Sequence, residues 1–233
     1  MQNPIILLIE TATNVCSCAL ASADNIIAFK QSKEPNAHSR MLAVMIDSLL
    51  KENDIAPCRL SGVAVSKGPG SYTGLRIGVS TAKGICYALS VPLISIETLY
   101  ILAFAARTEH KADLYLPMID ARRMEVYSAG YNYDLDIVKP VSADIIQSNI
   151  YDRYLKDANK AVLCGNGAAK CGEILKDDKY FYASDVELSA KYMAEAAYHK
   201  FITGQYEDVA YFEPYYLKDF VAAPSHIKGL YQR

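Results

Sequence analysis

Apolar and polar positions alternate along the first half of the chain in a way that predicts a mixed α/β unit. Short apolar or β-branched runs, typical of buried strands, are separated by longer segments with helical spacing. The first three runs are joined by short turns, which favours an antiparallel meander. The predicted order is strand, strand, strand, helix, strand, helix, strand and helix, at residues 5–9, 15–21, 26–30, 37–52, 62–66, 73–89, 91–96 and 97–107. This order matches the ribonuclease H-like core, a mixed sheet covered on both faces.

The second half of the chain begins in the same way. An apolar strand is predicted at residues 114–120, and its terminal Asp120 lies 110 residues after Glu10, which ends the first strand. A duplication is the simplest explanation, with two ribonuclease H-like halves facing each other in an actin-like (also Hsp70- and sugar-kinase-like) two-lobed fold with mixed sheets. Further strands are predicted at 124–131, 137–138 and 161–164, and helices at 142–149 and 188–203.

We place the boundary between the two predicted lobes in the polar segment near residue 108. The N-terminal ribonuclease H-like lobe then spans residues 1–108, and the C-terminal lobe spans 109–233 with a tyrosine-rich tail. Folds of this kind hold a nucleotide in the cleft between the lobes, with acids at the ends of the first strands. Glu10 and Asp120 occupy those positions and are the candidates for cofactor binding, although carboxylates also occur in ordinary turns at strand ends.

A glycine-rich turn joins the strand at 62–66 to the helix at 73–89. A dinucleotide-binding fingerprint needs a glycine one position before Gly74, and a P-loop needs lysine where Leu75 stands. The spacing therefore favours a tight structural turn over a phosphate site. A hydroxyl side chain in this turn can cap the helix that follows. The residues of the predicted structural loop are Gly68, Pro69, Gly70, Ser71 and Thr73.

Two features of the first two helices indicate a contact with another protein. The helix at 37–52 carries more apolar residues than one buried face needs, including two methionines that suit an adaptable surface. The helix at 73–89 has small residues at every fourth position, which lets another backbone approach closely. A helix enclosed in its own domain, and a stripe that crosses its own sheet, would explain the same features. The predicted partner surface comprises His38, Met41, Leu42, Met45, Leu49, Gly74, Gly78 and Ala82.

Charge and composition narrow the classes of function. The chain has 24 Lys and Arg against 26 Asp and Glu, a formal net charge of −2. This balance argues against a protein that binds nucleic acid alone, because phosphate contacts need a basic face. The cysteine spacing shows no zinc pattern, and no metal site is predicted. No segment approaches the roughly 18 apolar residues of a membrane span, and the N-terminus does not resemble a signal peptide, so we expect a cytoplasmic protein.

Several motifs resemble the TsaB family, also called YeaZ, of tRNA threonylcarbamoyladenosine biosynthesis proteins. The resemblance runs over residues 5–13, 38–40, 68–78, 120–127 and 214–217, and is strongest before residue 130. Its most specific marker is the block Gly-Pro-Gly-Ser-Tyr-Thr-Gly-Leu-Arg-Ile-Gly at 68–78.

The resemblance implies an actin-like fold and a non-catalytic scaffold or activating subunit, inactive on its own. Members of the family pair with a catalytic paralogue, TsaD, which transfers threonylcarbamoyl to the adenosine next to the anticodon of tRNAs that read ANN codons. The pairing surface in the family is built from the first two helices, and in isolation it can form a homodimer. An ATPase, TsaE, completes the complex, through which alone tRNA is contacted. No cofactor is expected to bind tightly to this chain alone, whereas ATP or ADP can bind in the complex.

No catalytic residue is predicted in this chain. The catalytic paralogue carries H-x-x-x-H for a metal ion, and here His38 matches the first position while Leu42 stands at the second. A single imidazole is a poor metal site, so His38 is interpreted as a structural or interface residue. Two alternative functions are a glycoprotease-like metallopeptidase and an actin-like ATP-dependent phosphotransferase. The first needs a metal or a nucleophile with its base, and the second needs phosphate-binding loops.

Overall fold

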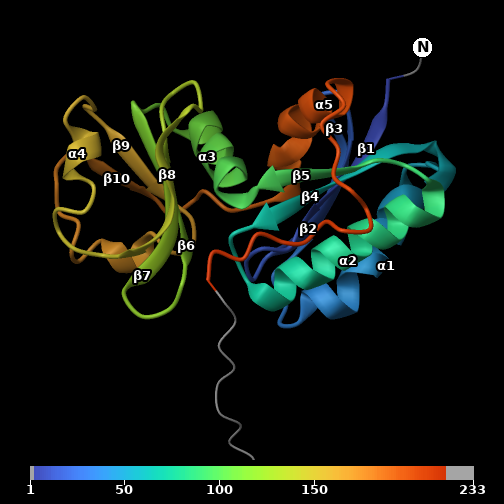
Figure 1. Cartoon of the computed structure of the whole chain (residues 1–233), viewed down its shortest axis with the longest axis horizontal. Coiled ribbons are helices and arrows are strands. Elements are labelled where there is room, and N and C mark those ends of the chain that lie inside the picture. Colours follow the sequence, from blue (N-terminus) through green and yellow to red (C-terminus); the bar gives the residue numbers. More distant parts are fainter. Residues whose placement is uncertain (1–2, 219–233) are drawn as a thin grey trace, which may run out of the picture.

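The computed structural model describes residues 3–218, which form two lobes, each built on a five-stranded sheet (Figure 1). The first sheet contains β1 (Ile5–Glu10), β2 (Cys16–Ser22), β3 (Asn25–Ser32), β4 (Leu60–Gly68) and β5 (Leu93–Glu97). The second sheet contains β6 (Leu114–Asp120), β7 (Glu125–Tyr131), β8 (Ile137–Ile145), β9 (Ala161–Cys164) and β10 (Tyr180–Ala183).

The two sheets have the same topology. The strand order is β3-β2-β1-β4-β5 in the first sheet, and β8-β7-β6-β9-β10 in the second when read in the same sense. In each sheet the first three strands pair antiparallel, and the last two run parallel to the central strand. This repeat confirms the predicted duplication of a ribonuclease H-like unit with mixed sheets.

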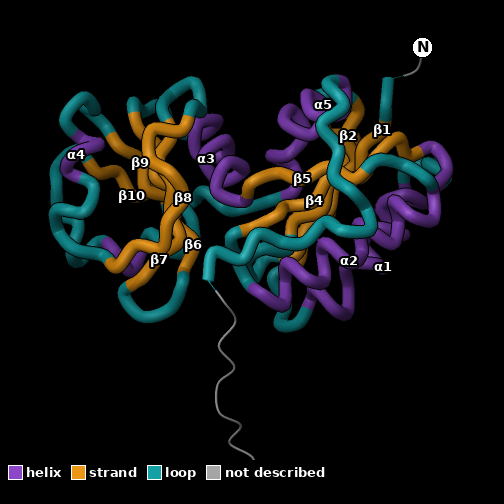
Figure 2. Tube along the Cα trace, viewed as in Figure 1, coloured by secondary structure: helices purple, strands orange, loops and turns teal. Residues whose placement is uncertain are grey.

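Helices cover both faces of the first sheet and connect it to the second (Figure 2). The helices are α1 (Ala37–Glu52), α2 (Tyr72–Leu89), α3 (Thr98–Glu109), α4 (Asp152–Leu155) and α5 (Ala194–Ile202), with short 3₁₀ helices η1 (Pro57–Arg59), η2 (Ala169–Cys171) and η3 (Ala190–Met193). The helices α1 and α2 share one core with one face of the first sheet, whereas α3, η3 and α5 share a core that extends into the second lobe. No helix within residues 3–218 is long and apolar enough to cross a bilayer.

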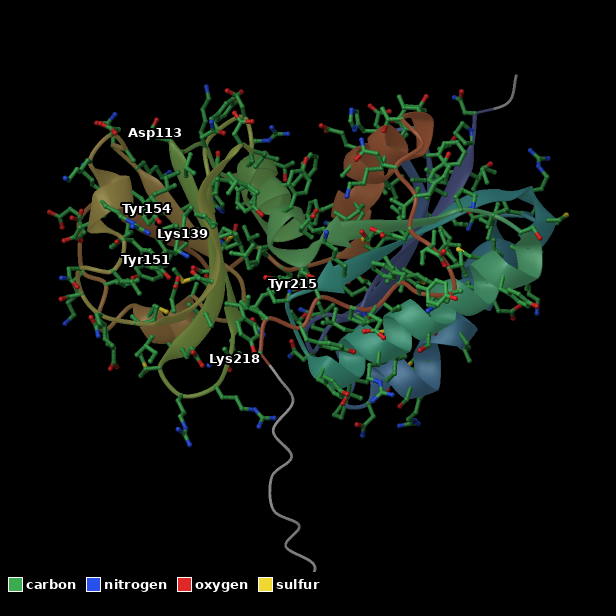
Figure 3. The ribbon with its side chains drawn as sticks, viewed as in Figure 1. Asp113, Lys139, Tyr151, Tyr154, Tyr215 and Lys218 are labelled. Atoms are coloured by element: carbon green, nitrogen blue, oxygen red, sulfur yellow. The ribbon has the colours of Figure 1, made fainter. Side chains whose placement is uncertain are left out.

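The helix predicted at 142–149 is wrong, because β8 extends to Ile145. Alternate residues of β8 meet partners on β7 that the local sequence does not reveal. Lys139 and Asp144 form a buried ion pair at 2.9 Å, and the Asp144 carboxylate accepts hydrogen bonds from Ser128 and Tyr151. Figure 3 labels Lys139 and Tyr151 inside the second lobe. This tertiary network favours the strand over the helix.

The chain returns to the first lobe after residue 190. The backbone N–H of Glu207 donates to the carbonyl of Leu93 at 2.8 Å, and Lys83 of α2 donates to the carbonyls of Ala210 and Phe212 at 3.0 Å. Residues 109–233 therefore do not form one packing unit in the described part of the chain, because the segment that includes η3 and α5 belongs with the first sheet. Residues 219–233 of the predicted tail lie outside the described residues.

Candidate functional site

The small residues of α2 face inward, onto the turn that follows β1. A Cβ atom added at Gly74 would lie 2.1 Å from the carbonyl oxygen of Thr11, and one added at Gly78 would lie 2.2 Å from its Oγ1. Ala82, further along the same stripe, is fully buried. The stripe therefore lets α2 approach its own sheet, and its assignment to the predicted partner surface needs correction.

The glycine loop completes this packing and starts α2. A Cβ atom at Gly70 would lie 2.4 Å from the carbonyl oxygen of Ala12, and the N–H of Ser71 donates to that oxygen at 2.7 Å. The Ser71 hydroxyl accepts from the N–H of Gly74 at 3.2 Å, which confirms one of the two predicted caps. Pro69 is buried and Thr73 is exposed. The loop is thus tied to the turn after β1 by hydrogen bonds and close contact.

The positive φ of Gly68 explains why glycine stands at the first position of the loop. Gly68 has φ +114°, a region that L residues with side chains rarely adopt. A Cβ atom there would also lie 2.5 Å from the carbonyl oxygen of Tyr215. The N–H of Tyr215 donates to the carbonyl of Lys67 at 2.7 Å, so the loop is held from the C-terminal segment as well.

The apolar residues predicted to bind a partner from α1 are mostly part of the protein's own core. Leu42 and Leu49 are 1% exposed and Met45 is 6% exposed, and Met41 is half-buried against the same cluster. Buried side chains cannot contact a partner while the lobe stays folded. This part of the prediction is corrected for the same reason as the glycine stripe.

The outward surface of α1 and α2 carries different residues. Val44 is 63% exposed and Tyr87 is 84% exposed, whereas a Cβ atom at Gly84 would meet nothing within 4 Å. The two helices lie on the same side of the first sheet (Figure 1). We call five of their exposed residues the outer face: Ala43, Val44, Ser80, Gly84 and Tyr87. Exposed charged residues of the same helices, among them Arg40, Asp47 and Arg76, are not included in this name.

A cleft of about 970 Å³ lies between the two lobes. Its walls come from the turn after β1, the start of α1, the glycine loop, the β6–β7 hairpin and residues 215–218. Of the two predicted acids, Asp120 lines the cleft, whereas Glu10 is fully buried and does not. His38 also lines the cleft, and its Nε2 atom is buried without a hydrogen-bond partner in the described chain.

Lysine side chains pair with two acids of the cleft, Asp120 and Glu125. Lys170 donates to the Asp120 carboxylate and, at 2.6 Å, to the carbonyl of Glu125. Partial burial alone would raise the pKa of Asp120, but the Lys170 hydrogen bond and charge bring it below its usual value. Lys218 lies 2.5 Å from the Glu125 carboxylate and so connects the C-terminal segment to the second lobe (Figure 3). Asp120 and Glu125 are therefore each held by a lysine.

Glu10 has a different environment. Its Oε1 accepts from the N–H of Ala12 at 2.5 Å, which fixes the turn that receives the glycines of α2. Burial raises the pKa of this carboxyl to about 7, against the opposing effect of the hydrogen bond from Ala12. Glu10 is therefore a structural acid beneath the turn after β1.

The cleft is lined by side chains of both charges, with Glu34, Asp120 and Glu125 as its acids. Lys33 and Arg122 line it together with Lys218. Among the described residues, no three His, Cys, Asp or Glu side chains are grouped so that they could hold a metal ion. His38 stands without the second ligand that a metal site would need.

Comparison with known proteins supports the family resemblance seen in the sequence. A family model described as tRNA N6-adenosine threonylcarbamoyltransferase (TsaD) matches residues 32–211. The tRNA threonylcarbamoyladenosine biosynthesis protein TsaB of Bacillus subtilis is 38% identical over 139 residues, 60% of each chain. The TsaB protein of Escherichia coli is 29% identical over 227 residues, which cover 93% of this chain and 96% of that one. This chain belongs to the TsaB/YeaZ family.

A solved structure of the TsaB/YeaZ family has the same fold. YeaZ from Pseudomonas aeruginosa superimposes with a TM-score of 0.80 at 24% identity, covering 92% of this chain and all of that one. The two-lobed, actin-like α/β fold predicted from the sequence is therefore confirmed.

Sequence reasoning missed the residues of the outer face. Val44 belongs to the surplus of apolar positions on α1 that indicated a second contact, so a signal for it existed. Tyr87 and Gly84 lie on the side of α2 opposite the small-residue stripe, and only the inward direction of that stripe identifies them.

Alanine substitutions at two glycines of α2 test the direction of the stripe. We expect Gly74→Ala to lower the free energy of unfolding by roughly 2 kcal/mol or more, because its Cβ would collide with the backbone of Thr11. Gly84→Ala on the same helix should raise it by roughly 0.5–1 kcal/mol, because Gly84 faces open space. Urea denaturation of both variants measures the difference, and equal effects would contradict the inward stripe.

Glu10→Gln tests the buried carboxyl. The pKa of Glu10 is about 7 in the folded protein and 4.5 as the ordinary value, so the unfolded chain loses its proton first as the pH rises. The stability of the unaltered chain relative to Glu10→Gln should therefore fall between pH 4.5 and 7, by about 3 kcal/mol in total. Denaturation of both proteins across this range measures the shift. A stability difference that does not change with pH would show that Glu10 does not titrate there.

Proposed function

We propose that this chain is a non-catalytic subunit in the biosynthesis of threonylcarbamoyladenosine in tRNA. In this proposal it pairs through the outer face with a TsaD-type transferase and supports threonylcarbamoyl transfer to the adenosine beside the anticodon of tRNAs that read ANN codons. Two observations support the role: the curated relatives carry TsaB names, and the matching family model describes the transferase itself.

The outer face is the observation that carries the proposal. A large aromatic side chain and a β-branched side chain stand exposed on neighbouring helices, and Gly84 leaves room for a partner to approach the α2 backbone. Interfaces depend most on a few such apolar anchors near their centre. Because the inward residues of α1 and α2 already fill the core, a partner can bind the outer residues without unfolding this lobe.

The chemistry of the cleft favours a supporting role over the two alternatives. The N–H groups of Ser71 and Gly74 are used within the protein, by Ala12 and by the Ser71 hydroxyl, so the glycine loop does not present them to a phosphate. Asp120 and Glu125 are paired with lysines, and His38 lacks a second metal ligand. No observation favours a metallopeptidase or a phosphotransferase.

The remaining partners follow from the same proposal. An ATPase of the TsaE type and tRNA are contacted in the assembled complex, in the cytoplasm, and ATP or ADP binds there. In the absence of the transferase, the outer face of one copy pairs with that of a second copy. Both arrangements use the same surface, so the homodimer should compete with the complex.

Val44→Asp tests the pairing surface, and Ile137→Asp provides a matched control. Val44 is 63% exposed on the outer face, and Ile137 is 61% exposed on β8 of the second lobe. We expect Val44→Asp to weaken binding to a TsaD-type protein by roughly tenfold or more, because it places a charge among interface anchors. Calorimetric titration of the purified proteins measures the dissociation constants, and Ile137→Asp should bind as the unaltered chain does.

Transfer assays complete this test. Threonylcarbamoyl transfer to tRNA should require both proteins and should fall with Val44→Asp in proportion to lost pairing. Unimpaired pairing by Val44→Asp would refute the outer face as the contact, and peptidase or kinase turnover by the chain alone would refute the non-catalytic role.

A further inference from the structure

Two arginines at the tip of the β6–β7 hairpin have an unfavourable backbone conformation. Arg122 has φ 69° and Arg123 has φ 50°, so both occupy the left-handed region. Glycine and asparagine adopt this region much more readily than arginine does. Local folding therefore does not explain why arginine stands at either position, and the reason has to be sought in the side chains.

Both arginine side chains lie at the surface, and the charge of Arg122 acts on the Asp120 carboxylate, whose pKa it helps to lower. Arg122 and Arg123 are exposed, and neither guanidinium makes a hydrogen bond or ion pair with a residue in the described range 3–218. Their hydrogen bonds come from the backbone: the N–H of Arg122 donates to Asp120 at 2.9 Å, and the carbonyl of Arg123 accepts from Lys170 at 2.8 Å.

The nearest acids already have partners. Asp120 is paired with Lys170, and Glu125 is paired with Lys218, which approaches from the C-terminal segment (Figure 3). Each lysine thus offsets the negative charge of one carboxylate at the base of the hairpin. Neither guanidinium at the tip has an ion pair of its own among the described residues, although the chain as a whole has a formal net charge of −2.

The tip belongs to the rim of the cleft and not to the outer face. Arg122 lines the cleft opposite the start of α1 and α2, and the cleft also exposes aromatic side chains, including Tyr127 and Tyr216. A planar guanidinium can donate two parallel hydrogen bonds to the oxygens of one phosphate. Aromatic rings beside a row of positive charges suit a ribonucleotide chain, because its bases can stack on them. A partner bound to the outer face would leave this rim accessible.

We propose that Arg122 and Arg123 contact phosphates of the RNA backbone when the complex binds tRNA. This inference rests on the proposed function, because the balanced charge of the chain gives it no broad basic face of its own. Two phosphate contacts add affinity and help to orient the RNA without reading its sequence. Free nucleotides carry the same phosphate chemistry, and the experiment below separates the two sources.

The test replaces the two arginines of the hairpin tip by residues that adopt the left-handed backbone conformation more readily. The double variant Arg122→Asn with Arg123→Gly removes both charges and relieves the left-handed strain, so its melting temperature should equal or exceed that of the unaltered chain. In complex with a TsaD-type protein, its dissociation constant for an unmodified tRNA should rise roughly tenfold, and the slope of log affinity against log salt should decrease by about 1 to 2. Fluorescence anisotropy with labelled tRNA measures both quantities.

Two control variants separate the loss of a contact at the hairpin tip from a general loss of positive charge. Lys111→Ala with Lys156→Ala removes two charges from exposed positions of the same half of the chain, away from the cleft, and should change tRNA affinity less than about twofold. Arg122→Lys with Arg123→Lys keeps the charges, so it should retain most of the salt slope while losing part of the affinity.

The possible failures are distinguishable. If the complex assembles but the Asn-Gly variant binds tRNA with unchanged affinity and salt slope, the hairpin proposal is wrong and the proposed function stands. If only ATP binding by the complex is lost, the contact belongs to a free nucleotide and the RNA proposal is equally wrong. If the unaltered chain does not bind a TsaD-type protein, the proposed function itself fails.

Discussion

The packing of the turn after β1 into the glycine positions of α2 determines how the rest of the first lobe is arranged. Gly70, Gly74 and Gly78 leave room for the backbone and side chain of Thr11 and for the backbone of Ala12, so α2 lies directly against the end of the central strand. This contact fixes the start of α2 at the cleft and turns its opposite side toward solvent. Any side chain at Gly74 or Gly78 would force α2 away from the strand. The wall of the cleft and the outer face would both move with the helix.

The electrostatics of the cleft agree with a supporting role. In enzymes of acid–base type, carboxylates are held with shifted pKa values next to the reacting atoms. Here the carboxyl with the strongly raised pKa, Glu10, is sealed below the cleft and bonded to Ala12. Two carboxylates that do reach the cleft, Asp120 and Glu125, are paired with Lys170 and Lys218. The guanidinium groups of the arginine tip form no ion pair among the described residues, which suits binding.

Much of the fold could be predicted because it depends on local patterns of apolar and turn residues. Apolar runs and turn residues predicted the succession of strands and helices in the first lobe, and the recurrence of a strand ending in an acid indicated the duplication. The strand at Tyr180–Ala183 was not predicted. The cap at Ser71 followed from its place before a helical segment. Features that depend on distant partners could not be predicted this way. Residues 142–145 join a strand because Asp144 pairs with Lys139 and bonds to Ser128, and the segment after residue 190 packs on a sheet formed far earlier in the chain.

The location of the partner surface was the part of the site that sequence could not settle, because small and apolar residues serve close packing inside a lobe as well as between proteins. Incorporation of a photo-crosslinking phenylalanine derivative tests it most directly. Placed at Tyr87, which is 84% exposed on α2, it should crosslink to a TsaD-type protein, whereas at Tyr133, 48% exposed in the second lobe, it should not. A crosslink from position 133 and none from position 87 would contradict the assignment of the outer face.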